Sequence, residues 1–100
     1  MAETLRTIDG EIDEIRERLS STGDNVVEIH LSVPTGKEKA FAYAEKAKVL
    51  SNLAEKMKAM AARNSVTHIR ELHVRVELSG IVKNQSATGD LIVTAIKIVQ

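Results

Sequence analysis

Apolar residues recur at intervals of three and four over two segments of the chain, and this is the period of an amphipathic helix. Across residues 4–20 the recurring residues are Leu5, Ile8, Ile12, Ile15 and Leu19. Residues 36–63 are rich in strong helix formers, and a capping sequence begins at Thr35. The apolar stripe of this second segment consists of Tyr43, Ala47, Leu50, Ala54, Met57 and Ala61. We therefore predict helices over both segments.

Apolar residues at every second position predict three strands, over residues 26–33, 66–82 and 91–99. The order helix, strand, helix, strand, strand predicts an α+β fold. In this fold two helices cover one face of a small, mainly antiparallel three-stranded sheet. We expect the whole chain, residues 1–100, to form a single domain.

The third predicted strand has apolar residues at both parities, which indicates burial on both faces. Two helices cover only one face, so an apolar strip would remain, and self-association is the simplest way to bury it. The narrow apolar stripe of the first helix could pack against the same stripe of a second copy. Phe41 falls on the polar face of the second helix and is a candidate contact residue. The predicted interface residues are Ile8, Ile12, Ile15, Phe41, Leu91, Val93 and Ala95.

Composition narrows the functions that the chain can have. The 14 basic and 14 acidic residues give a net charge of zero, and the chain contains no cysteine. Thiol chemistry and disulfides are therefore excluded. Aromatic residues make up only 2% of the chain, which argues against binding single-stranded nucleic acid by base stacking. Neither a signal peptide nor a long apolar run is present, so we expect a cytoplasmic protein without a membrane partner.

A possible anion site lies where the first predicted strand leads into the second predicted helix. Thr35, Gly36, Lys37 and Lys39 occur there, and backbone N–H groups at a helix start can hold an anion. The glycine spacing of a P-loop is missing. The alternative is a capping turn whose lysines are solvated.

Histidine and carboxylate residues share the outer parity of two predicted strands. His30 and Glu28 lie on one of them, and His73 and Glu77 on the other, so neighbouring strands could form a metal site. The spacing contains no ligand signature, so we predict neither a metal nor a cofactor; a polar sheet face is the alternative. No nucleophile or general base can be named, which favours a protein that is not an enzyme.

Two families share parts of this pattern. Residues 26–100, read as β-α-β-β and carried by Val66–Gln100, resemble the dodecins, which form hollow dodecamers and bind flavin on a tryptophan. The chain has no tryptophan, so flavin binding is not implied. Residues 68–72, leading into a hairpin that ends at residues 93–98, resemble Alba-type proteins. That resemblance implies a dimer that binds DNA or RNA.

Two functional hypotheses follow from these patterns. The first is a non-catalytic, homo-oligomeric binding or assembly protein, based on the apolar strip and the apolar stripe of the first helix. The alternative is an Alba-like nucleic-acid-binding protein that uses a basic helix and hairpin surface. The cations predicted for this alternative are Lys37, Lys39, Arg70, Arg75 and Lys83.

Overall fold

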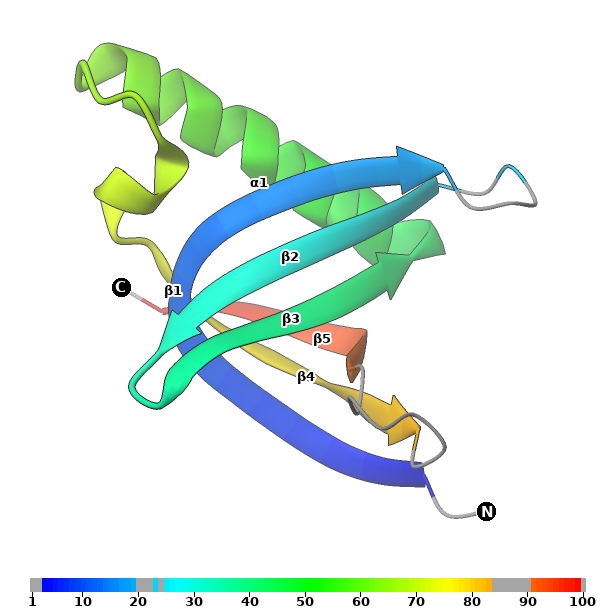
Figure 1. The fold of residues 1–100 in the computed structure, drawn as a ribbon. Coiled ribbons are helices and arrows are strands. Elements are labelled where there is room, and N and C mark those ends of the chain that lie inside the picture. Colours follow the sequence, from blue (N-terminus) through cyan, green and yellow to red (C-terminus); the bar gives the residue numbers. More distant parts are fainter. Residues whose placement is uncertain (1–2, 20–22, 24, 84–90, 100) are drawn as a thin grey trace.

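The computed structural model describes residues 3–19, 23, 25–83 and 91–99, which form a β-barrel with a helix (Figure 1). The elements in order are β1 (Glu3–Leu19), β2 (Asn25–Val33), β3 (Gly36–Tyr43), α1 (Ala44–Arg63), the 3-10 helix η1 (Ile69–Leu72), β4 (Arg75–Lys83) and β5 (Leu91–Val99). The strands close in the order β1-β2-β3-β5-β4. The predicted α+β fold, with two helices on a three-stranded sheet, is therefore wrong. The sheet arrangements that the dodecin and Alba resemblances imply are wrong for the same reason.

β1 is long enough to pair with two different strands, one in each half of the barrel. Its residues 3–11 pair with β4, and residues 11–19 pair with β2, both antiparallel. A short parallel contact between β3 and β5, at Ala40–Leu91 and Phe41–Ile92, closes the barrel. At the bend of β1, a Cβ on Gly10 would lie 2.5 Å from the carbonyl oxygen of Ser32. The close approach of β1 and β2 therefore requires glycine at this position.

The segment predicted as the first helix is β1, and a β-bulge explains the error. Ile8 and Ile12 both point into the barrel, because they are separated by an even number of residues and a strand alternates between its two faces. Gly10 lies between them on the same face. The register then shifts between Ile12 and Glu14, so that Ile15 also faces the core. Strand alternation interrupted by one extra residue thus produces the spacing of three and four that a helix would have.

The segment predicted as the second helix is a strand followed by a helix. In β3 the buried Ala40 and Ala42 alternate with outward residues. The chain changes direction at Ala44, whose positive φ of 52° is disfavoured for a residue with a Cβ. From there the predicted stripe is confirmed, because the buried residues of α1 are Ala47, Leu50, Ala54, Met57 and Ala61.

The C-terminal strands also differ from the prediction. Within residues 66–82, η1 precedes β4, which begins only at Arg75. In β5 the register shift opposite Ser79 and Gly80 leaves Thr94 as an extra residue. Leu91 and Val93 before it and Ile96 after it therefore face the same core. The inner face of β5 is thus formed by residues of both parities, whereas Ile92 points outward and Ala95 is exposed.

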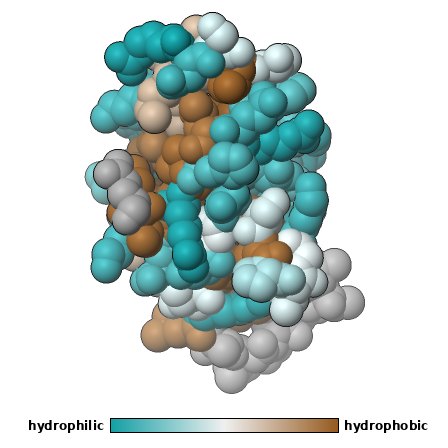
Figure 2. Space-filling model, turned by 90° about the vertical axis from the view of Figure 1, so that its left-hand side faces the viewer, coloured by the Kyte–Doolittle hydropathy of each residue, from teal (hydrophilic) through white to brown (hydrophobic). Residues whose placement is uncertain are grey.

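The core is aliphatic and lies inside the barrel, and α1 covers one part of it. Ile12, Ile29, Leu31, Leu50 and Leu78 are among its fully buried side chains. Figure 2 views the molecule from the left of Figure 1, and on that side apolar side chains reach the surface between hydrophilic ones. Within the described residues, no helix combines the length and the apolar character needed to cross a membrane.

Candidate functional site

The outward face of β1, β2 and β3 carries a regular array of charged and aromatic side chains. Successive residues of a strand point to opposite faces, so every second residue joins the array. The antiparallel register sets these residues in rows across the three strands. We call this surface the outer face and define it by Asp13, Glu14, Arg16, Arg18, Glu28, His30, Lys37, Lys39, Phe41 and Tyr43.

Both aromatic side chains of the protein lie on the outer face. The chain contains one phenylalanine, one tyrosine and no tryptophan. Phe41 and Tyr43 are two residues apart on β3, and Tyr43 is 44% exposed. The Nζ of Lys39 lies 5.4 Å from the centroid of the Phe41 ring, within range of a cation–π contact. One strand therefore presents cations and flat apolar surfaces next to each other.

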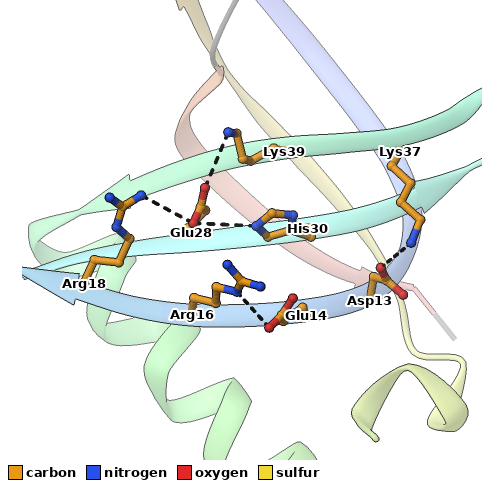
Figure 3. Close-up of polar contacts among 8 residues, drawn as sticks. All are labelled: Asp13, Glu14, Arg16, Arg18, Glu28, His30, Lys37 and Lys39. Atoms are coloured by element: carbon orange, nitrogen blue, oxygen red, sulfur yellow. Dashed lines mark hydrogen bonds and ion pairs between the residues drawn. The ribbon is translucent and has the colours of Figure 1, made fainter.

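A buried carboxylate lies in the middle of the outer face (Figure 3). The Glu28 side chain is only 6% exposed, and the side chains of one arginine, one lysine and one histidine approach it. Its oxygens lie 3.7 Å from Nη1 of Arg18, 3.6 Å from Nε2 of His30 and 3.6 Å from Nζ of Lys39. Because a buried charge is costly without partners, Glu28 holds these three groups around itself.

Two further ion pairs lie on β1 and β3 beside this cluster. The Nζ of Lys37 donates a hydrogen bond to Asp13 at 2.9 Å, and this bond holds the pKa of Asp13 below its ordinary value. The Nε of Arg16 donates to Glu14 at 2.8 Å, which lowers the pKa of Glu14 and raises that of Arg16. The outer face is thus nearly balanced in charge, but its arginine and lysine side chains are mostly exposed.

The residues of the predicted anion site do not form a helix start. Thr35 lies in the two-residue turn between β2 and β3, and Gly36 is the first residue of β3. Helix α1 begins eight residues later, at Ala44, so its N-terminal N–H groups are not part of this segment. Lys37 and Lys39 instead belong to the outer face.

The structure separates the cations predicted to bind nucleic acid. It brings Lys37 and Lys39 together, but Arg70 lies in η1, and Arg75 lies on β4, where it donates to Asp9 at 2.7 Å. Lys83 ends β4, and its side chain lies outside the described part. The prediction missed Arg16 and Arg18, because residues 4–20 were interpreted as a helix; their alternation in β1 was the available signal.

The residues predicted as an oligomer interface lie in different places. Ile8, Ile12, Leu91 and Val93 are buried in the barrel, and Ile15 packs against this core. Their burial therefore requires no second copy. Phe41 lies on the outer face, and Ala95 is exposed on β5.

The histidines contact different carboxylates. His30 approaches Glu28, and Nδ1 of His73 lies 3.0 Å from Glu11. Over the described ranges, no three His, Cys, Asp or Glu side chains come close enough together to hold a metal ion. Nε2 of His30 is buried and has no hydrogen-bond partner in the part of the chain that the structure describes.

Comparison with known proteins shows a shared fold. No protein-family model matches the sequence, and no curated protein does. Two crystal structures of Rim1, a mitochondrial single-stranded DNA binding protein from S. cerevisiae, superpose with TM-scores of 0.64 and 0.59. The sequence identities are 13% and 12%, and the matches cover 100% of this chain and 97% and 98% of the other chains. At this identity, the likeness establishes the barrel fold alone.

Proposed function

We propose that this protein binds single-stranded nucleic acid across the outer face. One observation carries the proposal: the only phenylalanine and the only tyrosine lie on the same face of one strand, directly beyond two lysines. Aromatic rings stack with bases of any sequence, and cations follow the phosphate backbone. A low aromatic content argues against stacking only when the few rings are scattered or buried, and here they are neither.

The geometry favours single strands over duplexes. Rows of the outer face repeat at about 7 Å along the strands, because every second residue of a strand points outward. Phe41 and Tyr43 occupy consecutive rows, and Arg16 and Arg18 lie on β1 in the same two rows. Unpaired bases can therefore stack on β3 while phosphates approach β1. The bases of a duplex are already stacked on each other and cannot use these rings.

The comparisons support this proposal at the level of the fold. The two solved neighbours are single-stranded DNA binding proteins. Five-stranded barrels of the OB type bind oligonucleotides and oligosaccharides on the face of their second and third strands. The outer face of the present barrel includes the same two strands, β2 and β3.

Titration of a labelled single-stranded oligonucleotide, followed by fluorescence anisotropy, tests the proposal. We expect the affinity to fall steeply with salt, because bound cations displace counterions from the phosphates. Phe41→Ala should weaken binding by about 1–3 kcal/mol, the value of one stacked base. Lys39→Gln should reduce, by about 0.7, the steepness with which the logarithm of the binding constant falls with the logarithm of the salt concentration. Lys58→Gln, on the exposed side of α1, should leave this slope unchanged.

Two results would contradict this function. One is the absence of binding at low salt. The other is equal affinity of the wild type and the Phe41→Ala variant, both folded by circular dichroism. Tighter binding of a duplex of the same sequence would show that the nucleic acid binds elsewhere than on Phe41 and Tyr43.

We also propose that the protein associates with a second copy of itself. Leu5 is 79% exposed, and the register places it beside Ile81, which in turn lies beside Ile92. These three residues point outward and lie side by side across β1, β4 and β5, and we call them the apolar row. A row of this kind can pack on its own copy about a two-fold axis.

A further inference from the structure

A large cleft lies at one end of the outer face. Its volume is about 1020 Å³, at the upper end of the range for small-molecule sites. The walls are the last residues of β1, the first residues of β2 and the first two turns of α1, which passes beside them in Figure 1. The cleft therefore lies where β1 and β2 extend along the helix.

The cleft is continuous with the outer face through two side chains. Arg18 and Tyr43 line the cleft, and both also belong to the outer face. The register joins them, because Arg18 pairs with Val26 and Val26 pairs with Tyr43. A chain that crosses Phe41 and reaches Tyr43 thus arrives at the entrance of the cleft.

The lining of the cleft combines apolar surface, one amide, two cations and the carboxylate of Glu17. Apolar surface comes from Leu19, which is 74% exposed, and the buried Val27 and Ala47 and the residue Tyr43 also border the cleft. The Asn25 amide can donate to and accept from the edge of a base. The Lys48 ammonium, together with Arg18, can approach a phosphate.

A hydrogen bond joins the two walls of the cleft. Ser51 on α1 donates to the carboxylate of Glu17 on β1, and both residues line the cleft. Glu17 belongs to the inner parity of β1, beyond the point where the barrel core ends. This bond connects the end of the strand to the helix across the cleft.

We propose that the cleft receives one nucleotide of the same single strand, the one that follows the bases stacked on Phe41 and Tyr43. This inference rests on the proposed function and adds a site away from the flat sheet. The base would lie against Leu19, and its phosphate would approach Arg18 and Lys48. The strand would thus turn from the sheet towards the helix.

Three substitutions on adjacent positions of α1 test the cleft. Ser51→Phe places a ring inside it, Ser51→Ala removes the hydrogen bond to Glu17 without adding a ring, and Asn52→Phe adds the same ring at an exposed position outside the lining. With long single-stranded oligonucleotides, we expect Ser51→Phe to weaken binding about tenfold. It should also shorten the oligonucleotide that binds with full affinity by about one nucleotide. Asn52→Phe should resemble the wild type, Ser51→Ala measures how much of the effect comes from loss of the hydrogen bond to Glu17, and thermal melting shows which variants are folded.

Photo-crosslinking of the wild type with an oligonucleotide that contains thiouracil provides a second measurement. We expect crosslinked peptides from both β3 and the segment that carries Lys48 and Ser51. Crosslinks confined to β1, β2 and β3, together with equal affinities of the Ser51→Phe and Asn52→Phe variants, would overturn the cleft and leave the outer face in place. Absence of any binding by the wild type would overturn both proposals.

Discussion

At the scale of single residues, Glu28 has the largest influence on the outer face. A carboxylate buried to this degree needs charged or polar partners, and here the cations Arg18 and Lys39 come from β1 and β3, with His30 of β2 beside them. The same cations are the groups that would meet phosphates. Glu28 therefore sets their positions in the free protein and competes with the nucleic acid for them.

Replacing this carboxylate changes binding in a defined direction. We expect Glu28→Gln to bind single-stranded oligonucleotides more tightly at low salt, because the outer face gains one unit of positive charge. The gain should shrink as salt is added. Glu45→Gln, an exposed carboxylate in the first turn of α1, is the control for net charge. Weaker binding of Glu28→Gln, measured by anisotropy on folded protein, would show that positioning outweighs competition.

The ion pair of Asp13 makes part of the stability depend on pH. Its pKa is lowered in the folded protein, first of all by the hydrogen bond from Lys37, so the pair stabilises the fold fully above the ordinary pKa of 3.8. This contribution is lost as the pH falls through the lowered folded value. Asp13→Asn should therefore melt below the wild type at about pH 6 and approach it at about pH 3. Thermal denaturation at both pH values measures this, and a constant difference would contradict it.

At the scale of elements, the end of α1 is a place where the chain can be stabilised. The N–H of Val66 bonds to the carbonyl of Ala61, and that of Ser65 to the carbonyl of Ala62, which is the pattern of a Schellman motif. Ser65 occupies the left-handed position with a φ of 57°, where glycine carries no steric penalty.

We expect Ser65→Gly to raise the stability by about 1 kcal/mol, because it removes the cost of a Cβ in the left-handed conformation. In a domain of this size, the melting temperature should rise by about 4–8 °C. Thr67→Gly, two residues further on, is the matched control and should bring no gain. An unchanged or lower melting temperature of Ser65→Gly would show that the serine conformation carries no such cost.

Short-range patterns predicted several of the elements, including β5 in spite of its register shift. The strands predicted at residues 26–33 and 91–99 fall on β2 and β5, and the stripe from Ala47 to Ala61 is the buried side of α1. β1 could not be identified in this way, because a bulge after Ile12 gives a strand the spacing of a helix. The closed barrel depends on pairs such as Thr7 and Ser79, which are 72 residues apart, and no local pattern contains that information.

The candidate site was predictable to a similar extent. Lys37, Lys39 and Phe41 stand out in the sequence as a basic stretch and a lone aromatic residue. Their grouping with Arg16 and Arg18 follows from the pairing of β1 with β2, which requires knowledge of the fold. Because a helix was predicted over residues 4–20, neither arginine was placed on the same face as the two lysines.

At the scale of the whole molecule, the apolar row predicts the state of association. We expect a molar mass above the 11.0 kDa of one chain in light scattering, and a return to that value in Leu5→Asp. The charge at residue 5 would be buried without a partner in the assembly. Val49→Asp, at an exposed apolar residue of α1, is the control and should keep the wild-type mass. A wild type that runs as a monomer would contradict the proposed association.

The division of β1 between two partner strands also affects how the protein folds. Its second half can form a hairpin with β2 early, because the two segments are close in the chain. Its first half waits for β4, so during synthesis it stays unpaired until the chain has been extended to Lys83. Folding dominated by such distant pairs is slow relative to that of helical proteins of the same size. A nascent chain would therefore expose Leu5 and Ile8 to chaperones and to other chains for most of its time on the ribosome.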